Sequence, residues 1–229
     1  VLRSFHESEA FVCIAFVGGT ALRFVYGLPR FSEDLDFSLE NKNGYEPAKW
    51  LRKVKRDLTD AGFDAAVRWN DKKNVQTAWI RVPALLKEAG LSDLKQQNLS
   101  IKLEIDTHPP AGASSLTGVI NRHVLFSTRY HDLPSLMAGK IHALVTRSYS
   151  KGRDWYDLLW YRAKRPPVEP NQGLLQNALD QTEGPGAMHA AQWTDLVLAR
   201  LEKLSEKNLK EDVESFLERR EEALLLTKA

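Results

Sequence analysis

Two acidic residues, Asp34 and Asp36, stand one position apart where an apolar stretch begins, shortly after the segment Gly18-Gly19-Thr20. Alternate side chains of a strand share a face, so both carboxylates would point the same way and could hold divalent cations together. The glycines let a backbone approach phosphate closely, and the amides that open the following helix favour negative charge. This pattern predicts a site for a nucleoside triphosphate (NTP) and metal ions, which is the chemistry of nucleotidyl transfer.

A third carboxylate would complete such a metal site, and the strand predicted over residues 99–107 offers two. Its apolar residues alternate with a polar face that carries Lys102, Glu104 and Asp106. In phosphoryl transfer, metal ions bridge the triphosphate and the attacking hydroxyl, which lies in line with the leaving pyrophosphate. We take Asp106 as the third ligand, able to help deprotonate that hydroxyl, with Glu104 as the competing choice. The alternative without function is an exposed residue at a strand edge.

Composition limits the function classes. The 229 residues are 43% hydrophobic and 27% charged, as in an ordinary protein with a buried core. The formal net charge of +2 gives no bulk electrostatic argument for nucleic-acid binding. The lone cysteine, Cys13, lies in an apolar run and cannot form an intrachain disulfide, which fits a reducing cytoplasm. Because neither a transmembrane run nor a signal-peptide pattern is present, we expect a cytoplasmic protein without membrane contact.

Hydrophobic periodicity separates the predicted elements into two groups. Strands are predicted over residues 11–17, 35–39, 63–69, 75–82, 99–107 and 124–127, with helices over 20–26 and 47–61. From Leu133 onwards the periodicity is helical, over residues 133–147, 154–163 and three later segments. These patterns predict an α/β core in residues 1–130 and a helical region in residues 131–229.

Two residues of the helical region have properties that suit phosphate chemistry. Lys140 lies among apolar helix residues, where an ammonium can stabilise negative charge on a leaving group; a solvated helix tip is the alternative. Asp154 lies at a predicted helix start, where capping is its simplest role. The basic residues of the helix over 47–61 are the best candidates for RNA contact, although a solvated helix face explains them as well: Lys49, Arg52, Lys53, Lys55 and Arg56.

Several segments together resemble a known family. Gly18–Leu22 followed by Arg30–Phe37 resembles the first motif of the DNA polymerase beta superfamily of nucleotidyltransferases. In detail the chain is most similar to the AbiE-type (AbiEii) abortive-infection toxins, because Asp132–Lys140 and Lys151–Leu158 resemble two further motifs of that group. Thr20 stands where many superfamily members have serine, which keeps the hydroxyl. The matches span about residues 11–162.

The resemblance implies a polymerase-beta-like α/β (α+β) core with a mixed sheet, followed by a helical C-terminal region. It implies Mg²⁺ (or Mn²⁺) as cofactor and NTP as substrate. Asp34, Asp36 and Asp106 would hold the metal, and Lys140 and Asp154 would join them as catalytic residues. The nucleotide-binding residues would be Gly18, Gly19, Thr20, Arg30, Ser32 and Lys140. Arg153 and Asp157 are secondary candidates, because Asp154 and Asp157 could orient Lys140.

The function that the resemblance implies is that of a bacterial toxin used in phage defence. Such a toxin would transfer a nucleoside monophosphate to an acceptor, with the tRNA 3′ end as the expected target, and so block translation. A cognate antitoxin protein would neutralise it. Two alternatives stay open at this stage: a nucleotidyltransferase that modifies a small molecule such as an antibiotic, and a catalytically inactive binding module of the same fold.

Other residue groups carry weaker signals. His108 has no partner at metal-ligand spacing, and His142, on a predicted helix, is expected to serve packing or to lie at the surface. Trp155, Trp160 and Tyr161 follow helical spacing, which favours a place in the core over a base-stacking platform.

Overall fold

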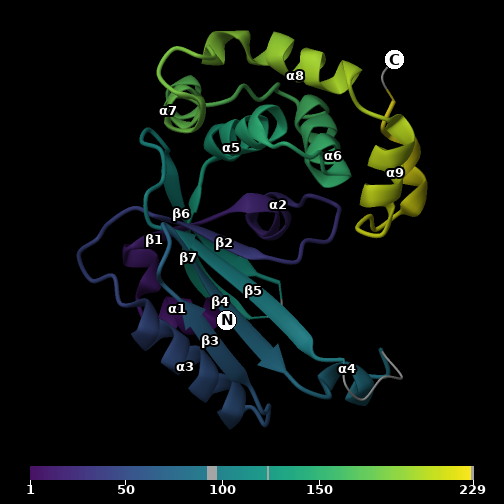
Figure 1. Cartoon of the computed structure of the whole chain (residues 1–229). Helices are drawn as coiled ribbons and strands as arrows, with labels where there is room; N and C mark the ends of the chain where they lie inside the picture. The colour runs from purple at the N-terminus through teal and green to yellow at the C-terminus, as the bar shows by residue number, and fades with distance from the viewer. Residues whose placement is uncertain (92–96, 123, 228–229) are drawn as a thin grey trace. The chain divides into compact units, whose positions relative to one another are not determined.

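The computed structural model describes residues 1–91, 97–122 and 124–227 (Figure 1). The chain forms two compact units. Unit 1 is Val1–Ala21, Glu33–Pro109 and Thr117–Tyr130, and unit 2 is Leu22–Ser32, Pro110–Leu116 and His131–Ala229. The segments 22–32 and 110–116, which the sequence-based division placed in the first half, therefore belong to unit 2.

Unit 1 is built on a mixed sheet whose strand order, among the described residues, is β3-β4-β5-β2-β1-β7-β6. β2 pairs parallel with β5 and β1 pairs parallel with β7, whereas β1–β2, β3–β4 and β4–β5 are antiparallel. The strands are β1 (Ile14–Val17), β2 (Leu35–Leu39), β3 (Ala66–Asn70), β4 (Val75–Val82), β5 (Leu99–Asp106), β6 (Ser115–Asn121) and β7 (Leu125–His131). Only the ends of β6 and β7 belong to unit 2. The predicted α/β class with a mixed sheet is confirmed.

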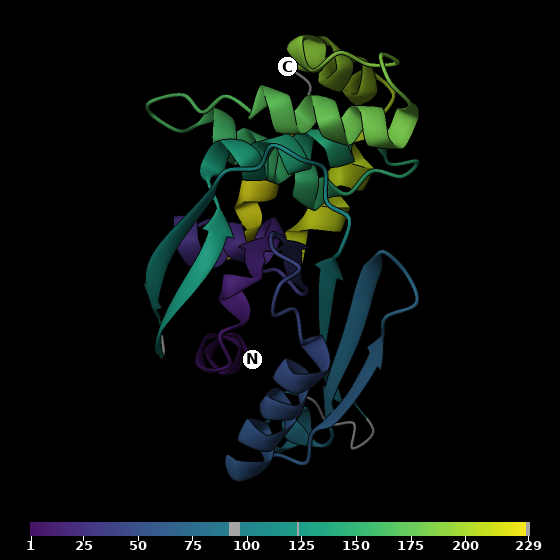
Figure 2. The same cartoon turned by 90° about the vertical axis from the view of Figure 1, so that its left-hand side faces the viewer.

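The core of unit 1 lies between the sheet and two helices, α1 (Leu2–Glu7) and α3 (Pro47–Asp60) (Figure 2). The buried ring of Phe5 lies 5.3 Å from that of Phe37 on β2 and 5.9 Å from that of Trp50 on α3. Ala78 and Ile80 on β4 are buried as well. Since alternate strand residues face opposite sides, this core leaves the polar residues of β2, β4 and β5 on the other face.

The strand β6 was missed by the sequence analysis, which predicted strand structure in this region over residues 124–127 alone. β6 is an edge strand, and most of its residues are exposed or half-buried, so the apolar alternation that marks a strand is weak. It also contains Gly118, where a β-carbon would approach the Tyr130 hydroxyl of β7 to 2.8 Å. The glycine thus permits close pairing while it lowers the strand signal.

Unit 2 is helical after His131. Its main helices are α5 (Leu133–Thr146), α6 (Gly152–Arg162), α7 (Gln172–Glu183), α8 (Trp193–Glu202) and α9 (Glu206–Glu214). The Asp132 carboxylate accepts a hydrogen bond from the Ser135 amide at 2.9 Å and caps α5. Trp155 and Tyr161 on α6 are buried, which confirms their place in the core, whereas Trp160 is half-buried.

The remaining elements are short, and one helix crosses the division between the units. α2 (Gly18–Tyr26) belongs to unit 1 up to Ala21 and to unit 2 from Leu22. The short elements are α4 (Leu85–Glu88) and the 3₁₀ turns η1 (Ala10–Val12), η2 (Ala190–Gln192) and η3 (Arg220–Leu225). In the part of the chain that the structure describes, no helix combines the length and the hydropathy needed to cross a membrane.

Gly152 is the first residue of α6 and lies against α9. Only glycine fits there, because a β-carbon at this position would collide with the Leu209 carbonyl oxygen. A β-carbon built on Gly139, in α5, would meet only open space. We expect Gly152→Ala to lower the free energy of unfolding by about 1–3 kcal/mol through overpacking. Gly139→Ala, the matched control, should leave it unchanged or raise it by about 0.5–1 kcal/mol. Urea denaturation followed by circular dichroism measures both; equal effects would contradict this account of the helix contact.

Candidate active site

Unit 1 places the acidic pair directly beside the glycine turn. Val17 at the end of β1 pairs with Asp36 on β2, so Gly18 follows next to that carboxylate. Gly18 has a φ of +76°, and a β-carbon built on it would collide with Asp36 Oδ2. The hydroxyl of Thr20 donates to the carbonyl oxygen of Asp34, which ties the first turn of α2 to the start of β2. The structure thus brings together Gly18, Thr20, Asp34 and Asp36 as a local unit.

The neighbouring strand β5 supplies a further carboxylate next to this pair. In the parallel register, Glu104 lies beside Asp36, whereas Asp106 lies beside Ser38, two residue pairs further along. The Asp106 carboxylate also accepts a hydrogen bond from the His108 amide at 2.9 Å. The register therefore favours Glu104 over Asp106 as the third carboxylate, in the reverse of the order expected from the sequence. Parallel register could not be read from the alternation of β5 alone.

Lys102 provides positive charge at the same position on the sheet. Its ammonium lies 2.7 Å from the Glu104 carboxylate. Burial lowers the pKa of Lys102, but the hydrogen bond to Glu104 and the charges of Glu104, Asp34 and Asp36 outweigh this, so that the pKa is raised. Lys102 is therefore charged and offsets part of the repulsion among the three carboxylates.

These carboxylates do not form a closed metal cage. Among the described residues, no group of three histidine, cysteine or acidic side chains has the arrangement of a metal site. A metal ion held by Asp34, Asp36 and Asp106 therefore stays a prediction. The donor set nevertheless fits Mg²⁺, which prefers hard oxygen ligands. Mg²⁺ is usually bound by one or two carboxylates together with substrate phosphates and waters.

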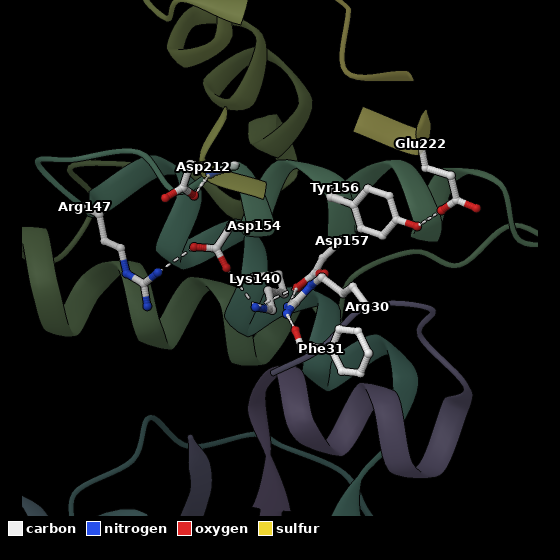
Figure 3. Close-up of polar contacts among 10 residues, drawn as sticks. Arg30, Phe31, Lys140, Arg147, Asp154, Tyr156, Asp157, Asp212 and Glu222 are labelled. Atoms are coloured by element: carbon white, nitrogen blue, oxygen red, sulfur yellow. Dashed lines mark hydrogen bonds and ion pairs between the residues drawn. The ribbon is translucent and has the colours of Figure 1, made fainter. Parts of the chain in front are cut away.

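Unit 2 contains a separate cluster of charged residues around Lys140 (Figure 3). The Lys140 ammonium lies 2.8 Å from Asp154 Oδ1 and 2.8 Å from Asp157 Oδ2. Arg30 forms a bidentate pair with Asp157, with both N···O distances at 2.6 Å. Arg147 contacts the second oxygen of Asp154 at 2.5 Å. Three cations thus surround two carboxylates, which leaves the cluster with one net positive charge.

Helix geometry and two backbone contacts position this cluster. α5 carries Lys140, and α6 carries Asp154 and Asp157 one turn apart on the same face. The loop residue Arg30 forms a bridge with Leu217, and the neighbouring Phe31 amide donates to the Phe216 carbonyl at 2.7 Å. The loop is therefore held against the C-terminal segment, with Arg30 turned inward.

Burial differs within the cluster and indicates different roles. The side chains of Asp157 and Arg30 are 0% and 2% exposed, whereas that of Lys140 is 14% exposed. The sequence predicted that Arg30 binds the nucleotide, but its guanidinium is buried against Asp157, which favours a role in supporting Lys140. Arg147 was missed by the sequence analysis; it lies two helical turns after Lys140, a spacing that could have pointed to it.

Asp154 and Lys140 stay ionised through the neutral range. Burial raises the pKa of Asp154, but Lys140, Arg147 and Arg30 outweigh this and lower it, so its contribution to stability is lost only as pH falls through that lowered value. Burial lowers the pKa of Lys140, but Asp157 and Asp154 outweigh this and raise it. The contribution of Lys140 is therefore lost only as pH rises through the raised value.

Three other predicted residues have simpler surroundings. The guanidinium of Arg153 lies over the Phe216 ring at 4.0 Å. Ser32 is half-buried in the loop between Arg30 and β2. Gly19 lies in the first turn of α2. For these residues, contact with a nucleotide stays a prediction.

The basic face of α3 is partly neutralised by acidic neighbours. Lys53 pairs with Glu7 at 2.7 Å and with Asp57 at 2.9 Å, and Lys49 pairs with Glu46 at 3.0 Å. These ion pairs reduce the positive charge available to RNA phosphates on this face, which weakens the prediction that α3 contacts RNA.

The acidic pair beside a glycine turn is typical of a nucleotidyltransferase, and the comparison with protein-family models agrees. A model of the family described as "Nucleotidyl transferase AbiEii toxin, Type IV TA system" matches residues 1–226. The chain therefore belongs to the AbiEii family of nucleotidyltransferase toxins of type IV toxin–antitoxin systems, which implies an antitoxin partner. The resemblance identified from the sequence is confirmed.

Two solved structures from Helicobacter pylori are similar over 98% of this chain. One is a nucleotidyltransferase candidate, with 21% identity, a TM-score of 0.48 and 88% of that chain covered. The other is JHP933, with 22% identity, a TM-score of 0.48 and 85% of that chain covered. None of the curated proteins matches the chain.

We expect Asp157→Asn to lower the free energy of unfolding by about 3–5 kcal/mol, because it leaves the buried Arg30 without its partner charge. Arg147→Gln, in the same cluster but with a 39% exposed side chain, should cost about 0–1 kcal/mol. Thermal and urea unfolding at neutral pH measure both variants. If the Asp157 variant is as stable as the Arg147 variant, the buried pair does not hold the cluster together.

Proposed function

We propose that this protein is a metal-dependent nucleotidyltransferase toxin that transfers a nucleoside monophosphate from an NTP to the 3′ end of tRNA and so blocks translation. The observation that carries the proposal is the placement of Asp36 against Gly18 and of Asp34 against Thr20, with Glu104 on the adjacent strand. Family membership supports the transferase and toxin parts of the proposal. The tRNA acceptor comes from the family resemblance.

The chain's own residues have distinct roles in this reaction. The amides of Gly18 and Gly19 bind phosphate oxygens at the start of α2. Asp34 and Asp36 hold the metal, which, when bound, neutralises charge on the triphosphate. Glu104 accepts the proton of the acceptor hydroxyl. The acceptor oxygen forms a bond to the α-phosphorus, the bond from that phosphorus to the bridging oxygen breaks, and pyrophosphate leaves.

The charged cluster of unit 2 contributes positive charge in this proposal. Lys140 is held by two carboxylates at 2.8 Å and is the most exposed of the three residues in that contact. A lysine so fixed can present its remaining donor to a phosphate oxygen without a large loss of side-chain entropy. Asp154 and Asp157 act as positioning residues for Lys140.

Removing the Asp36 carboxylate tests the proposal directly. We expect Asp36→Asn to reduce transfer of labelled nucleotide to tRNA by more than about 100-fold, because even indirect support of a metal is worth 10- to 100-fold. Asp71→Asn, which changes an exposed carboxylate in the β3–β4 turn, is the control and should keep full activity. The assay uses purified protein, Mg²⁺ and each labelled NTP in turn, with either total RNA or a mixture of small hydroxyl-bearing molecules as acceptor. Labelling of small molecules but no RNA would contradict the tRNA part, and silence of the wild-type protein with every acceptor would contradict the whole proposal.

The choice between the two β5 carboxylates gives a second test. We expect Glu104→Gln to lower the transfer rate by about 10²-fold or more, as loss of a general base does. Asp106→Asn should lower it less than tenfold, since Asp106 lies beside Ser38 and caps a turn. Single-turnover rates at saturating RNA measure the chemical step. The reverse order of effects would return the role of base to Asp106.

A further inference from the structure

An exposed tryptophan stands on the face of the sheet that α1 and α3 leave uncovered. Trp79 on β4 is 39% exposed, whereas its neighbours in the strand, Ala78 and Ile80, are 0% exposed. Unit 1 therefore turns the ring of Trp79 outward, although burial of a tryptophan side chain would be favourable. An outward aromatic ring on a rigid strand is a surface on which a flat ligand can stack.

Cationic residues flank this ring on both sides. In the antiparallel register, Trp79 lies opposite Arg68 on β3 and opposite Lys102 on β5. Arg81 lies two residues further along β4 and therefore on the same face. Within the described part of the chain, neither Arg68 nor Arg81 makes an ion pair. We call Arg68, Trp79, Arg81 and Lys102 the open face.

The open face is continuous with the candidate active site. Two residue pairs along the strands, and so on the same face, Thr77 lies opposite Glu104, and Glu104 lies beside Asp36. With about 4.8 Å between neighbouring strands, β4 lies about 10 Å from β2 across the sheet. Burial lowers the pKa of Lys102, but Glu104, Asp34 and Asp36 outweigh it and raise the pKa, which places Lys102 within electrostatic reach of the acidic pair.

The order of strands determines which substrate meets the open face. β1 lies on one side of β2 and leads into Gly18 and Gly19, the proposed phosphate-binding turn, while β5 and β4 lie on the other side. In phosphoryl transfer the attacking and leaving oxygens are in line on opposite sides of the phosphorus. If pyrophosphate leaves on the β1 side, the acceptor hydroxyl enters from the side of β5 and β4.

We propose that the open face binds the acceptor RNA strand: Trp79 stacks on an unpaired nucleobase near the 3′ end, and Arg68 and Arg81 contact the adjoining phosphates. This inference rests on the proposed function. An aromatic ring flanked by cations suits single-stranded RNA, because every base can stack and every linkage carries a negative charge. The nucleobase of the incoming NTP offers the same ring chemistry, but its phosphates are already bound at the glycine turn and leave Arg68 and Arg81 without a partner.

The test measures binding separately from transfer. A fluorescently labelled, short single-stranded RNA is titrated with the Asp36→Asn protein, which is expected to bind without turnover. Adding Trp79→Ala should weaken its Kd roughly 10- to 100-fold, whereas Trp79→Phe, which keeps an aromatic face, should stay within a few-fold. Tyr149→Ala, which removes another exposed aromatic ring, is the matched control and should leave the Kd unchanged.

Salt dependence tests the two arginines. Arg68→Gln and Arg81→Gln should each reduce the slope of log K against log salt by about 0.7, the value for one phosphate contact on a single strand. Circular dichroism checks that each variant folds. If Trp79→Ala does not fold, Arg68→Glu and Arg81→Glu, which reverse charge on an exposed face, replace it. These two variants should weaken RNA binding more than the glutamine variants do.

Each outcome supports or overturns the inference. Unchanged RNA affinity in Trp79→Ala, or in the charge-reversal variants where these replace it, overturns it. A raised KM for the NTP in the single variant Trp79→Ala, which keeps Asp36, overturns it too when RNA affinity is unchanged, and it assigns the ring to the nucleotide. Weaker RNA binding in the variants, together with no transfer by the wild-type protein, keeps the open face as an RNA site and contradicts the proposed function alone.

Discussion

The arrangement of the charged cluster in unit 2 depends on the ion pairs that the buried Asp157 carboxylate forms with Arg30 and Lys140. This carboxylate joins a loop, α5 and α6, and its oxygens lie 2.6 Å from Arg30 and 2.8 Å from Lys140. Removing such charges from water costs several kcal/mol per ion, so a buried ion pair is weak evidence for stability gained over an apolar core. The more informative consequence of these ion pairs is geometric, because two carboxylates hold the Lys140 ammonium in one position. The cluster therefore supports Lys140, and the exposed fraction of the side chains rises from Asp157 through Arg30 to Lys140.

Unit 1 is constrained by a close approach of a different kind. Any side chain at residue 18 would occupy the space of the Asp36 carboxylate, and the positive φ of Gly18 is a conformation that glycine adopts without strain. The same turn begins α2, whose first amides favour negative charge, next to a strand that carries two acids. A phosphate bound at this turn would thus be attracted by the helix amides and repelled by the two nearby carboxylates. A cation between them reconciles the two, which is the physical reason to expect a metal with the nucleotide.

The sequence predicted those parts of the fold that depend on residues close together in the chain. The alternation of β5, the acidic pair at the start of β2 and the change to helical periodicity after Leu133 were all visible before the structure. The choice between Glu104 and Asp106 was not, because it depends on the parallel register of two strands that are far apart in the chain. The pair between Arg30 and Asp157 joins residues 127 positions apart, so no periodicity could reveal it. β6 was missed because an exposed edge strand with a central glycine has little apolar alternation.

The absence of a closed carboxylate cage in the described residues is consistent with the proposed chemistry. A rigid cage would hold a metal whether or not a nucleotide were present, and would leave fewer coordination positions for phosphate. Mg²⁺ gives up its waters reluctantly and commonly takes one or two carboxylates with substrate phosphates. In the proposed reaction, Asp34 and Asp36 therefore supply part of the coordination and the triphosphate supplies the rest. Glu104, paired with Lys102 at 2.7 Å, is then available to act on a proton rather than on the metal.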